Sequence, residues 1–194
     1  MADKLIPTPS QTVGPFFHLG LDRPEWGDLT RSNPAGEKIA IAGRVLDGDG
    51  APVPDAMIEL WQANAAGRYN HPDDRQDEKP LDPNFRGFGR VATDGEGRFR
   101  VVTIKPGPVP GRGNALQAPH INIAVFARGM LIHLFTRIYF AEDPRNAADP
   151  LLSSIDDAAV RGTLLARQAG AGEPPVWEFD IVLQGDRETA FLDI

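Results

Sequence analysis

The fold class is decided by residues 39–50, which read Ile39-Ala40-Ile41-Ala42-Gly43-Arg44-Val45-Leu46-Asp47-Gly48-Asp49-Gly50. The branched apolar side chains at the start of this segment fall on alternate residues, as they do in a strand with one buried face. The Asp-Gly pairs at its end accept the left-handed backbone that tight turns between strands require. The segment therefore predicts a strand that begins at Ile39 and ends in a hairpin turn.

Similar apolar runs, each bounded by turn-forming residues, recur along the whole chain. We expect further strands at residues 57–62, 88–93, 98–104, 120–127, 131–140, 177–183 and 189–192. The motif Asp94-Gly95-Glu96-Gly97 predicts a second hairpin turn, and Arg128-Gly129 predicts a two-residue turn. About seven or eight short strands in this arrangement predict an all-β fold, and specifically a β-sandwich.

The segments without a strand pattern predict the remaining organisation. Residues 1–37 are rich in turn formers and predict an extended N-terminal arm with short ordered pieces, ahead of one domain at residues 38–194. Residues 63–86 predict a long polar loop, and loops of that length are usually functional or disordered. Residues 154–169 predict one short helix, with Ser154 as its N-cap.

Composition and charge limit the partners and the environment of the protein. The net charge of −7 argues against nucleic acid or an anionic membrane as the main partner. No apolar run approaches the roughly 20 residues that cross a bilayer, and the N-terminal residues lack the apolar core of a signal peptide. The absence of cysteine excludes disulfides, thiolate metal sites and cysteine nucleophiles, and it fits a reducing cytoplasm, where we expect the protein.

Few residues are arranged for chemistry of their own. The sequence has neither a Gly-x-Ser-x-Gly motif nor a phosphate-binding loop. His120 and Asn122 share one face of the expected strand, where a His-x-His pair would form half of a metal site. A neutral amide is a poor ligand for a transition metal, so we expect no metal in this chain. Arg128 at its turn is either a solvated surface residue or a group that reaches an anion in a neighbouring subunit.

Several segments occur together in a fixed order. They are Thr12-Val13-Gly14-Pro15-Phe16-Phe17, Gly43-Arg44-Val45-Leu46-Asp47-Gly48-Asp49-Gly50, Glu59-Leu60-Trp61-Gln62-Ala63-Asn64, Thr103-Ile104-Lys105-Pro106-Gly107 and Phe179-Asp180-Ile181-Val182-Leu183. Together they resemble the intradiol ring-cleaving dioxygenases. The ordered set spans essentially the whole chain. The resemblance implies a transthyretin-like β-sandwich and oxygen-dependent intradiol cleavage of an aromatic diol.

The resemblance also implies where iron ligands would stand. Catalytic chains of the family hold ferric iron with two tyrosines and two histidines, and the matching positions here are Gln76, Val109, His120 and Asn122. Three of the four ligands are therefore missing, and His120 is what remains of a former site. The resemblance thus implies Fe(III) in a partner chain and no metal in this one.

Some members of the family pair an iron-bearing chain with a related iron-free chain. The segments Ala118-Pro119-His120-Ile121-Asn122-Ile123 and Phe126-Ala127-Arg128-Gly129 resemble the iron-free chain. In such enzymes the iron-free chain contributes a Thr-x-Gly-Pro segment and this arginine to the pocket of its partner. The resemblance implies that Thr12, Gly14 and Pro15 form part of the substrate-binding wall. It also implies an electrostatic role for Arg128, in an assembly of several such pairs.

Two other hypotheses stay open from the sequence alone. The chain could be a transthyretin-like binding module without a catalytic partner, which predicts a stable monomer. It could also be an active homodimeric dioxygenase with unrecognised ligands, which predicts a coloured, iron-loaded protein when the chain is expressed alone.

Overall fold

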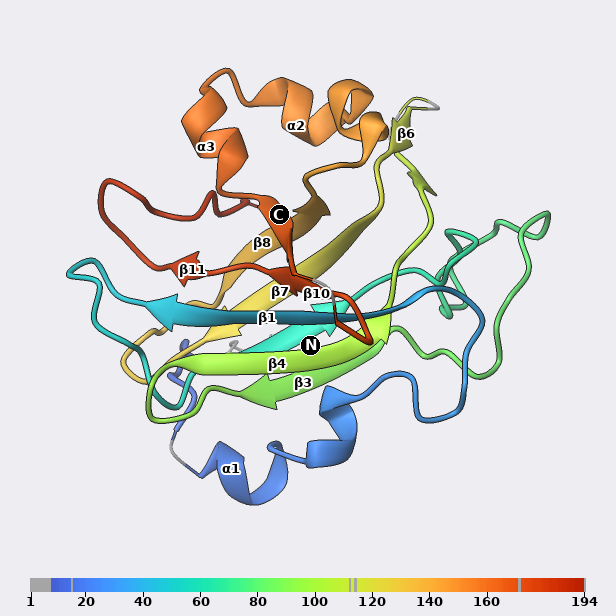
Figure 1. Ribbon diagram of the computed structural model, residues 1–194. Coiled ribbons are helices and arrows are strands. Elements are labelled where there is room, and N and C mark those ends of the chain that lie inside the picture. The colour runs from blue at the N-terminus through green and yellow to red at the C-terminus, as the bar shows by residue number, and fades with distance from the viewer. Residues whose placement is uncertain (1–7, 15, 112, 114, 171, 194) are drawn as a thin grey trace, which may run out of the picture.

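The computed structural model describes residues 8–14, 16–111, 113, 115–170 and 172–193, and most of its regular structure is strand (Figure 1). The strands are β1 Lys38–Leu46, β2 Met57–Trp61, β3 Phe88–Ala92, β4 Arg98–Ile104, β5 Val109–Pro110, β6 Leu116–Gln117, β7 His120–Phe126, β8 Leu134–Phe140, β9 Leu165–Ala169, β10 Val176–Glu178 and β11 Ile181–Val182. The helices are α1 Phe17–Gly20, α2 Pro150–Ser154 and α3 Ala158–Gly162, with 3-10 turns η1 Pro24–Gly27 and η3 Pro144–Ala148. The prediction of a mainly β fold with little helix is confirmed.

The strands form one main sheet that nearly closes on itself. Its order is β11-β1-β10-β9-β8-β7-β2-β3, and β4 pairs with β1 off this path. A tight turn at residues 94–97 joins β3 to β4 (Figure 1). The turn is as predicted, but the two strands do not form a hairpin, because β3 pairs with β2 and β4 pairs with β1. β5 and β6 form a separate two-stranded ribbon. β5 lies in the proline-rich segment 105–111, and proline cannot donate to the hydrogen-bond ladder of a central strand.

The main core lies inside this sheet and follows the alternation expected from the sequence. Ile39 of β1 and both Ile121 and Val125 of β7 are fully buried. Phe140 and Trp177 pack edge to face across the core, with ring centroids 4.9 Å apart. Burial of side chains of this kind stabilises a fold by about 1.5–3 kcal/mol each. Because β7 pairs with both β2 and β8 in this core, its two ends have fixed places in the molecule.

The prediction of one helix at residues 154–169 is wrong. Two short helices, α2 and α3, precede a strand, β9, at Leu165–Ala169. Asp149 caps α2 by accepting hydrogen bonds from two backbone N–H groups, and Ser154 is the last residue of that helix rather than its cap. The physical reason is that the sheet captures the later residues, since Tyr139 donates its N–H to the carbonyl of Leu164 at 2.8 Å.

Three further segments differ from the prediction in part or in full. Arg128 and Gly129 form the centre of a turn closed by the N–H of Met130 and the carbonyl of Ala127 at 3.2 Å, as predicted, but the whole connection is longer. β7 ends at Phe126 and β8 begins at Leu134, so residues 127–133 lie between the strands. The expected strand at 177–183 is divided between β10 and β11. Residues 189–192, which the structure describes in full, form an isolated bridge between Leu192 and Phe135 instead of a strand.

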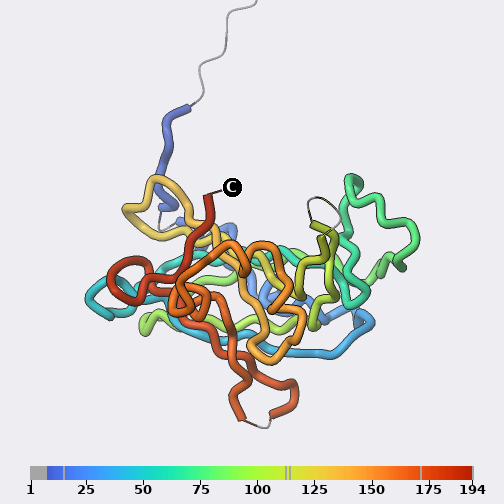
Figure 2. Tube along the Cα trace, turned by 90° about the horizontal axis from the view of Figure 1, so that it is seen from above, coloured from blue at the N-terminus to red at the C-terminus, as the bar shows by residue number. Residues whose placement is uncertain are grey.

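The N-terminal segment contains ordered pieces, as expected, and it crosses one side of the sheet. The backbone N–H of Leu29 donates to the carbonyl of Val102 in β4 at 2.9 Å. Figure 1 shows α1 on the side of the sheet opposite α2 and α3. Figure 2 shows the first described residues beside the loop that follows β7. In the part of the chain that the structure describes, no helix is long and apolar enough to cross a membrane.

Candidate functional site

Two of the four positions matched to iron ligands, Gln76 and Val109, line the same pocket. This pocket has a volume of about 370 Å³ and is also lined by Tyr69. The side-chain amide of Gln76 donates to the carbonyl of Gly67 and to the carboxylate of Asp74, each at 3.0 Å, so it is held within its own loop. Val109 in β5 is buried and offers no ligand atom. The long polar loop thus folds back so that Gln76 lies at the same pocket as Val109.

His120, the third position, is a buried and neutral imidazole at the start of β7. Its Nδ1 lies 2.8 Å from the carbonyl oxygen of Ala118, which can only accept, so Nδ1 carries the proton. Burial, followed by the nearby Arg137 cation, lowers the pKa of His120 to about 4. The ring also packs against that of Tyr139, with centroids 5.6 Å apart. His120 is therefore a well-satisfied core residue.

Asn122, the fourth position, is bonded to a guanidinium that the sequence analysis missed. Arg137 on β8 donates from Nε to the side-chain oxygen of Asn122 at 2.9 Å and from Nη1 to Gln117 at 2.7 Å. The side-chain nitrogen of Asn122 donates to the carbonyl of Trp61 at 3.2 Å. The sequence signal that could have identified Arg137 is that it is the one charged residue in the mostly apolar run at 134–140. The result is a permanent positive charge beside the former ligand positions.

These donor atoms do not fit ferric iron. Gln76 and Asn122 are neutral amides with other partners, and Val109 has no donor. Burial, the largest cause, raises the pKa of the nearby Tyr69 phenol, which disfavours the anionic form that a ferric ion binds. Across the described ranges, no group of three or more His, Cys, Asp or Glu side chains could hold a metal ion.

The two segments implied to reach a partner, the N-terminal arm and the loop after β7, meet in the structure. The hydroxyl of Thr12 donates to the carbonyl of Ala127 at 3.1 Å and accepts from the N–H of Gly129 at 2.8 Å. These bonds join residues that are more than a hundred positions apart in the sequence and flank Arg128 on both sides. A side chain added at Gly14 would meet nothing within 4 Å, so the arm is open there. Pro15 lies outside the described residues.

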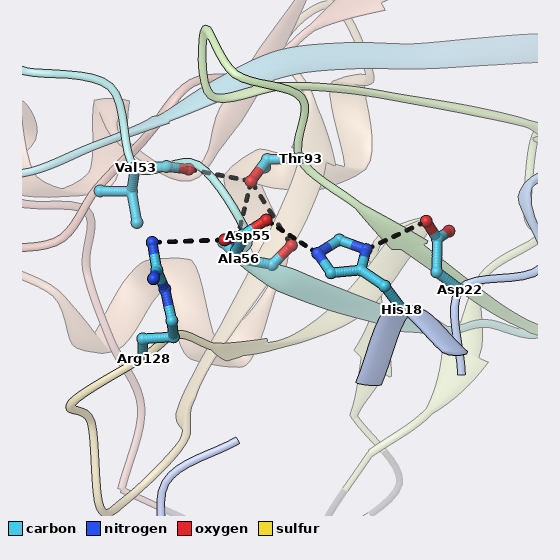
Figure 3. Close-up of polar contacts among 7 residues, drawn as sticks. All are labelled: His18, Asp22, Val53, Asp55, Ala56, Thr93 and Arg128. Atoms are coloured by element: carbon cyan, nitrogen blue, oxygen red, sulfur yellow. Dashed lines mark hydrogen bonds and ion pairs between the residues drawn. The ribbon is translucent and has the colours of Figure 1, made fainter. Parts of the chain in front are cut away.

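Arg128 forms an ion pair with a carboxylate that no sequence motif indicated. Its Nη2 lies 3.3 Å from Oδ2 of Asp55, and 54% of its side chain is exposed. The other oxygen of Asp55 lies 2.8 Å from Nε2 of His18, whose Nδ1 lies 3.3 Å from Asp22 (Figure 3). Desolvation lowers the pKa of His18, but its hydrogen bonds to Asp55 and Asp22 outweigh that effect and raise the pKa above its ordinary value.

The largest described cavity, of about 1010 Å³, lies elsewhere, against the strands β1, β4, β9 and β10. Its lining includes Arg44, Arg98, Arg100, Arg167 and Arg187 and none of the predicted site residues. The site residues singled out from the sequence therefore lie outside the lining of this cavity.

Comparison with known proteins gives the family. A family model described as Dioxygenase matches residues 16–185. The chain is 40% identical to the protocatechuate 3,4-dioxygenase alpha chain of Pseudomonas putida, and the match covers 100% of both chains. The chain belongs to the intradiol dioxygenase family. A second relative of this intradiol dioxygenase is the protocatechuate 3,4-dioxygenase beta chain of Burkholderia cepacia, at 42% identity over 91% of this chain and 75% of the relative.

A solved structure agrees with the fold of this intradiol dioxygenase. The dioxygenase domain of a carbohydrate-binding fusion protein from Streptomyces sp. SirexAA-E aligns with a TM-score of 0.63 and 29% identity. The alignment covers 95% of this chain and 100% of that domain. The family resemblance seen in the sequence motifs is thus confirmed.

Proposed function

We propose that this chain is the iron-free alpha subunit of a protocatechuate 3,4-dioxygenase and that it completes the active site of an iron-bearing beta subunit. The assembled enzyme uses O2 to cleave 3,4-dihydroxybenzoate between its hydroxylated carbons and forms 3-carboxy-cis,cis-muconate. The 40% identity to an alpha chain over the full length of both chains supports this proposal. The side chains at the matched ligand positions, which do not fit ferric iron, support it as well. Fe(III) is then a cofactor of the partner, and several alpha–beta pairs form the assembly.

The single observation that carries the proposal is the contact between the arm and the loop that bears Arg128. Two motifs at distant points of the sequence are implied to serve one pocket, and the hydroxyl of Thr12 holds them together. Both the donor and one acceptor position of that hydroxyl are used by the backbone, which suits a wall-forming role rather than proton transfer. Gly14, which has open space beside it, allows close approach of a substrate or a partner.

Arg128 is suited to an electrostatic role because its charge is permanent and its side chain is half exposed. Protocatechuate is an aromatic carboxylate whose hydroxyl groups become anionic when they bind ferric iron. A fixed cation near such charge stabilises it without reorganisation at the moment of reaction. The ion pair with Asp55 involves Nη2, and a guanidinium has five N–H donors, so donors remain for an anion.

We further infer that the nearly closed sheet is a β-sandwich of the transthyretin-like type and that residues 38–194 form one domain. The fold of the Streptomyces dioxygenase domain, matched over its full length, supports both inferences. A stable product after proteolytic removal of the arm, with its secondary structure retained, is the expected result for such a domain.

Copurification with a beta chain tests the proposed function. We expect the alpha–beta complex to contain iron and to consume protocatechuate with O2, whereas this chain alone has neither the visible ferric–phenolate absorbance nor ring cleavage. A coloured, iron-loaded and active chain without the beta subunit would favour the homodimeric enzyme. A stable monomer that does not associate with a beta chain would favour the binding module.

A further inference from the structure

A single carboxylate connects the two segments that are proposed to face the partner. Asp55 lies in the connection between β1 and β2. One of its oxygens is 3.3 Å from Nη2 of Arg128, and the other is 2.8 Å from Nε2 of His18 in α1 (Figure 3). Each oxygen therefore serves one segment, the loop after β7 on one side and the arm on the other.

The backbone that carries Asp55 is firmly anchored. Its φ of 62° lies in the left-handed region, which few residues other than glycine, asparagine and aspartate adopt. The buried hydroxyl of Thr93 accepts from the N–H of Ala56 at 2.8 Å and donates to the carbonyl of Val53 at 2.9 Å, so it ties down both sides of the turn. The carboxylate is thus presented from a fixed base rather than from a free loop.

Arg128 is held from two independent directions. The hydroxyl of Thr12 binds the backbone on either side of it, through Ala127 and Gly129. Asp55 binds its guanidinium at one nitrogen and leaves 54% of the side chain exposed. The backbone contact fixes where the loop lies, and the carboxylate contact restricts the rotamers of the side chain. Such restriction before binding lowers the entropy lost when an anion is bound.

We infer that Asp55 is a positioning residue, which holds Arg128 and the helix α1 of the arm in one arrangement for the pocket completed by this chain. The inference rests on the proposed function and adds to it a residue that does not itself touch the substrate. In this arrangement the ordering of Arg128 precedes substrate binding. Loss of the Asp55 carboxylate then raises KM for protocatechuate more than it lowers kcat.

The test uses alpha-chain variants copurified with the beta chain. Asp55→Asn removes the charge but keeps a residue that tolerates the left-handed backbone, and Asp55→Gly is a second variant with the same tolerance. An ion pair as exposed as this one is worth at most about a factor of five. We expect kcat/KM to fall about three- to fivefold, mainly through KM, and Asp49→Asn in an exposed hairpin turn to match the wild type.

A double-mutant cycle with Arg128→Ala separates positioning from a general structural effect. If Asp55 acts through Arg128, Asp55→Asn causes a smaller loss of kcat/KM once Arg128 is alanine, and only the part that passes through His18 and the arm remains. An equal loss in both backgrounds overturns the inference while leaving the proposed function intact. If Arg128→Ala alone leaves kcat and KM unchanged, the proposed role of Arg128 fails, and the inference fails with it.

A second measurement follows the arm without reference to activity. Amide hydrogen exchange in residues 16–22 is expected to become faster in Asp55→Asn, where the hydrogen bond from His18 loses its charged acceptor, and faster still in Asp55→Gly, where the acceptor is absent. It is expected to stay unchanged in Asp49→Asn. Unchanged exchange in both Asp55 variants would show that the carboxylate does not hold the arm, and would overturn that part of the inference.

Discussion

At the residue scale, Arg137 adds a positive charge to the positions that the family resemblance matches to iron ligands. Its guanidinium donates hydrogen bonds to Asn122 and Gln117. It is also the second cause, burial being the first, of the lowered pKa of His120. A guanidinium does not lose its proton in proteins, so the charge is permanent. A ferric ion placed nearby would be repelled by that charge. The same charge would oppose iron binding even if the missing ligands were restored.

The effect of Arg137 on His120 can be measured directly. Arg137→Gln removes the positive charge and keeps a hydrogen-bond donor for Asn122. We expect the pKa of His120 to rise from about 4 but to stay below 6.5, because burial is the larger cause and remains. An NMR titration of the imidazole C–H resonances gives the value. Arg145→Gln, at an exposed arginine, is the matched control, and a pKa of His120 that is the same in all three proteins would contradict this account.

His120 also makes the stability of the fold depend on pH. Its folded-state pKa of about 4 lies below the ordinary value of 6.5, so between these values the unfolded chain binds more protons. The free energy of unfolding should therefore fall as pH falls from 6.5 towards 4, by up to about 3 kcal/mol from this group.

Denaturant unfolding of the wild type and of His120→Gln across this pH range measures the effect of that single group. We expect the variant to lose less stability than the wild type as the pH falls. Parallel profiles for the two proteins would show that His120 does not make the predicted contribution.

The residues predicted from the sequence and those missed differ in a physical way. Gln76, Val109 and Asn122 could be named because each falls at a fixed offset within a local motif. Arg137 and Asp55 could not, because their roles arise from contacts between separate elements. A cross-strand bond from β8 to β7 defines the first, and a meeting of three loop and helix segments defines the second.

At the element scale, β7 has the positions matched to iron ligands at its start and the Arg128 loop at its end. His120 and Asn122 lie at its start, and Arg128 follows its end. At roughly 3.3 Å per residue, Asn122 and Phe126, the last residue of β7, are separated by about 13 Å, and Arg128 lies beyond that end. Changes at the former metal site can therefore leave the Arg128 loop undisturbed, because the core side chains between them fix the strand.

The contact between the arm and this loop is the element-scale feature most open to mutation. Thr12→Val keeps the shape of the side chain but loses both hydrogen bonds to residues 127–129, each worth about 1 kcal/mol. We expect faster amide exchange at Gly129 and a lower kcat/KM in the assembled enzyme. Thr8→Val, at an exposed threonine of the same arm, is the matched control. Equal exchange at Gly129 in the two variants would contradict a role for Thr12 in docking the arm.

The misassigned helix shows where a local pattern is overruled by the sheet. Residues 154–169 carry only a modest apolar stripe, and two aspartate caps divide the helical part into α2 and α3. The remaining residues pair with β8 on one side and β10 on the other. β10 follows after residues 170–175, but β8 ends at Phe140, so one of the two pairings that hold β9 is not local in the sequence. The strands with a clear alternation and a turn at their end, such as β1 and β7, were predicted well.

At the scale of the whole molecule, the chain keeps the architecture of its family while its own ligand positions do not fit iron. The nearly closed sheet positions the smaller pocket at one end of β7 and the arm with Arg128 at the other. On this account the molecule serves as a support for surface groups that act in the pocket of a partner.

The kinetics of Arg128→Ala in the assembled alpha–beta enzyme test this account most directly. Iron content per beta chain is measured in the same samples, with Arg128→Lys as the variant that keeps the charge without the planar fork of donors. The account predicts wild-type iron content and a kcat/KM for protocatechuate that falls about tenfold or more in Arg128→Ala, with a smaller loss in Arg128→Lys. A fully iron-loaded Arg128→Ala enzyme with unchanged kcat and KM would contradict it.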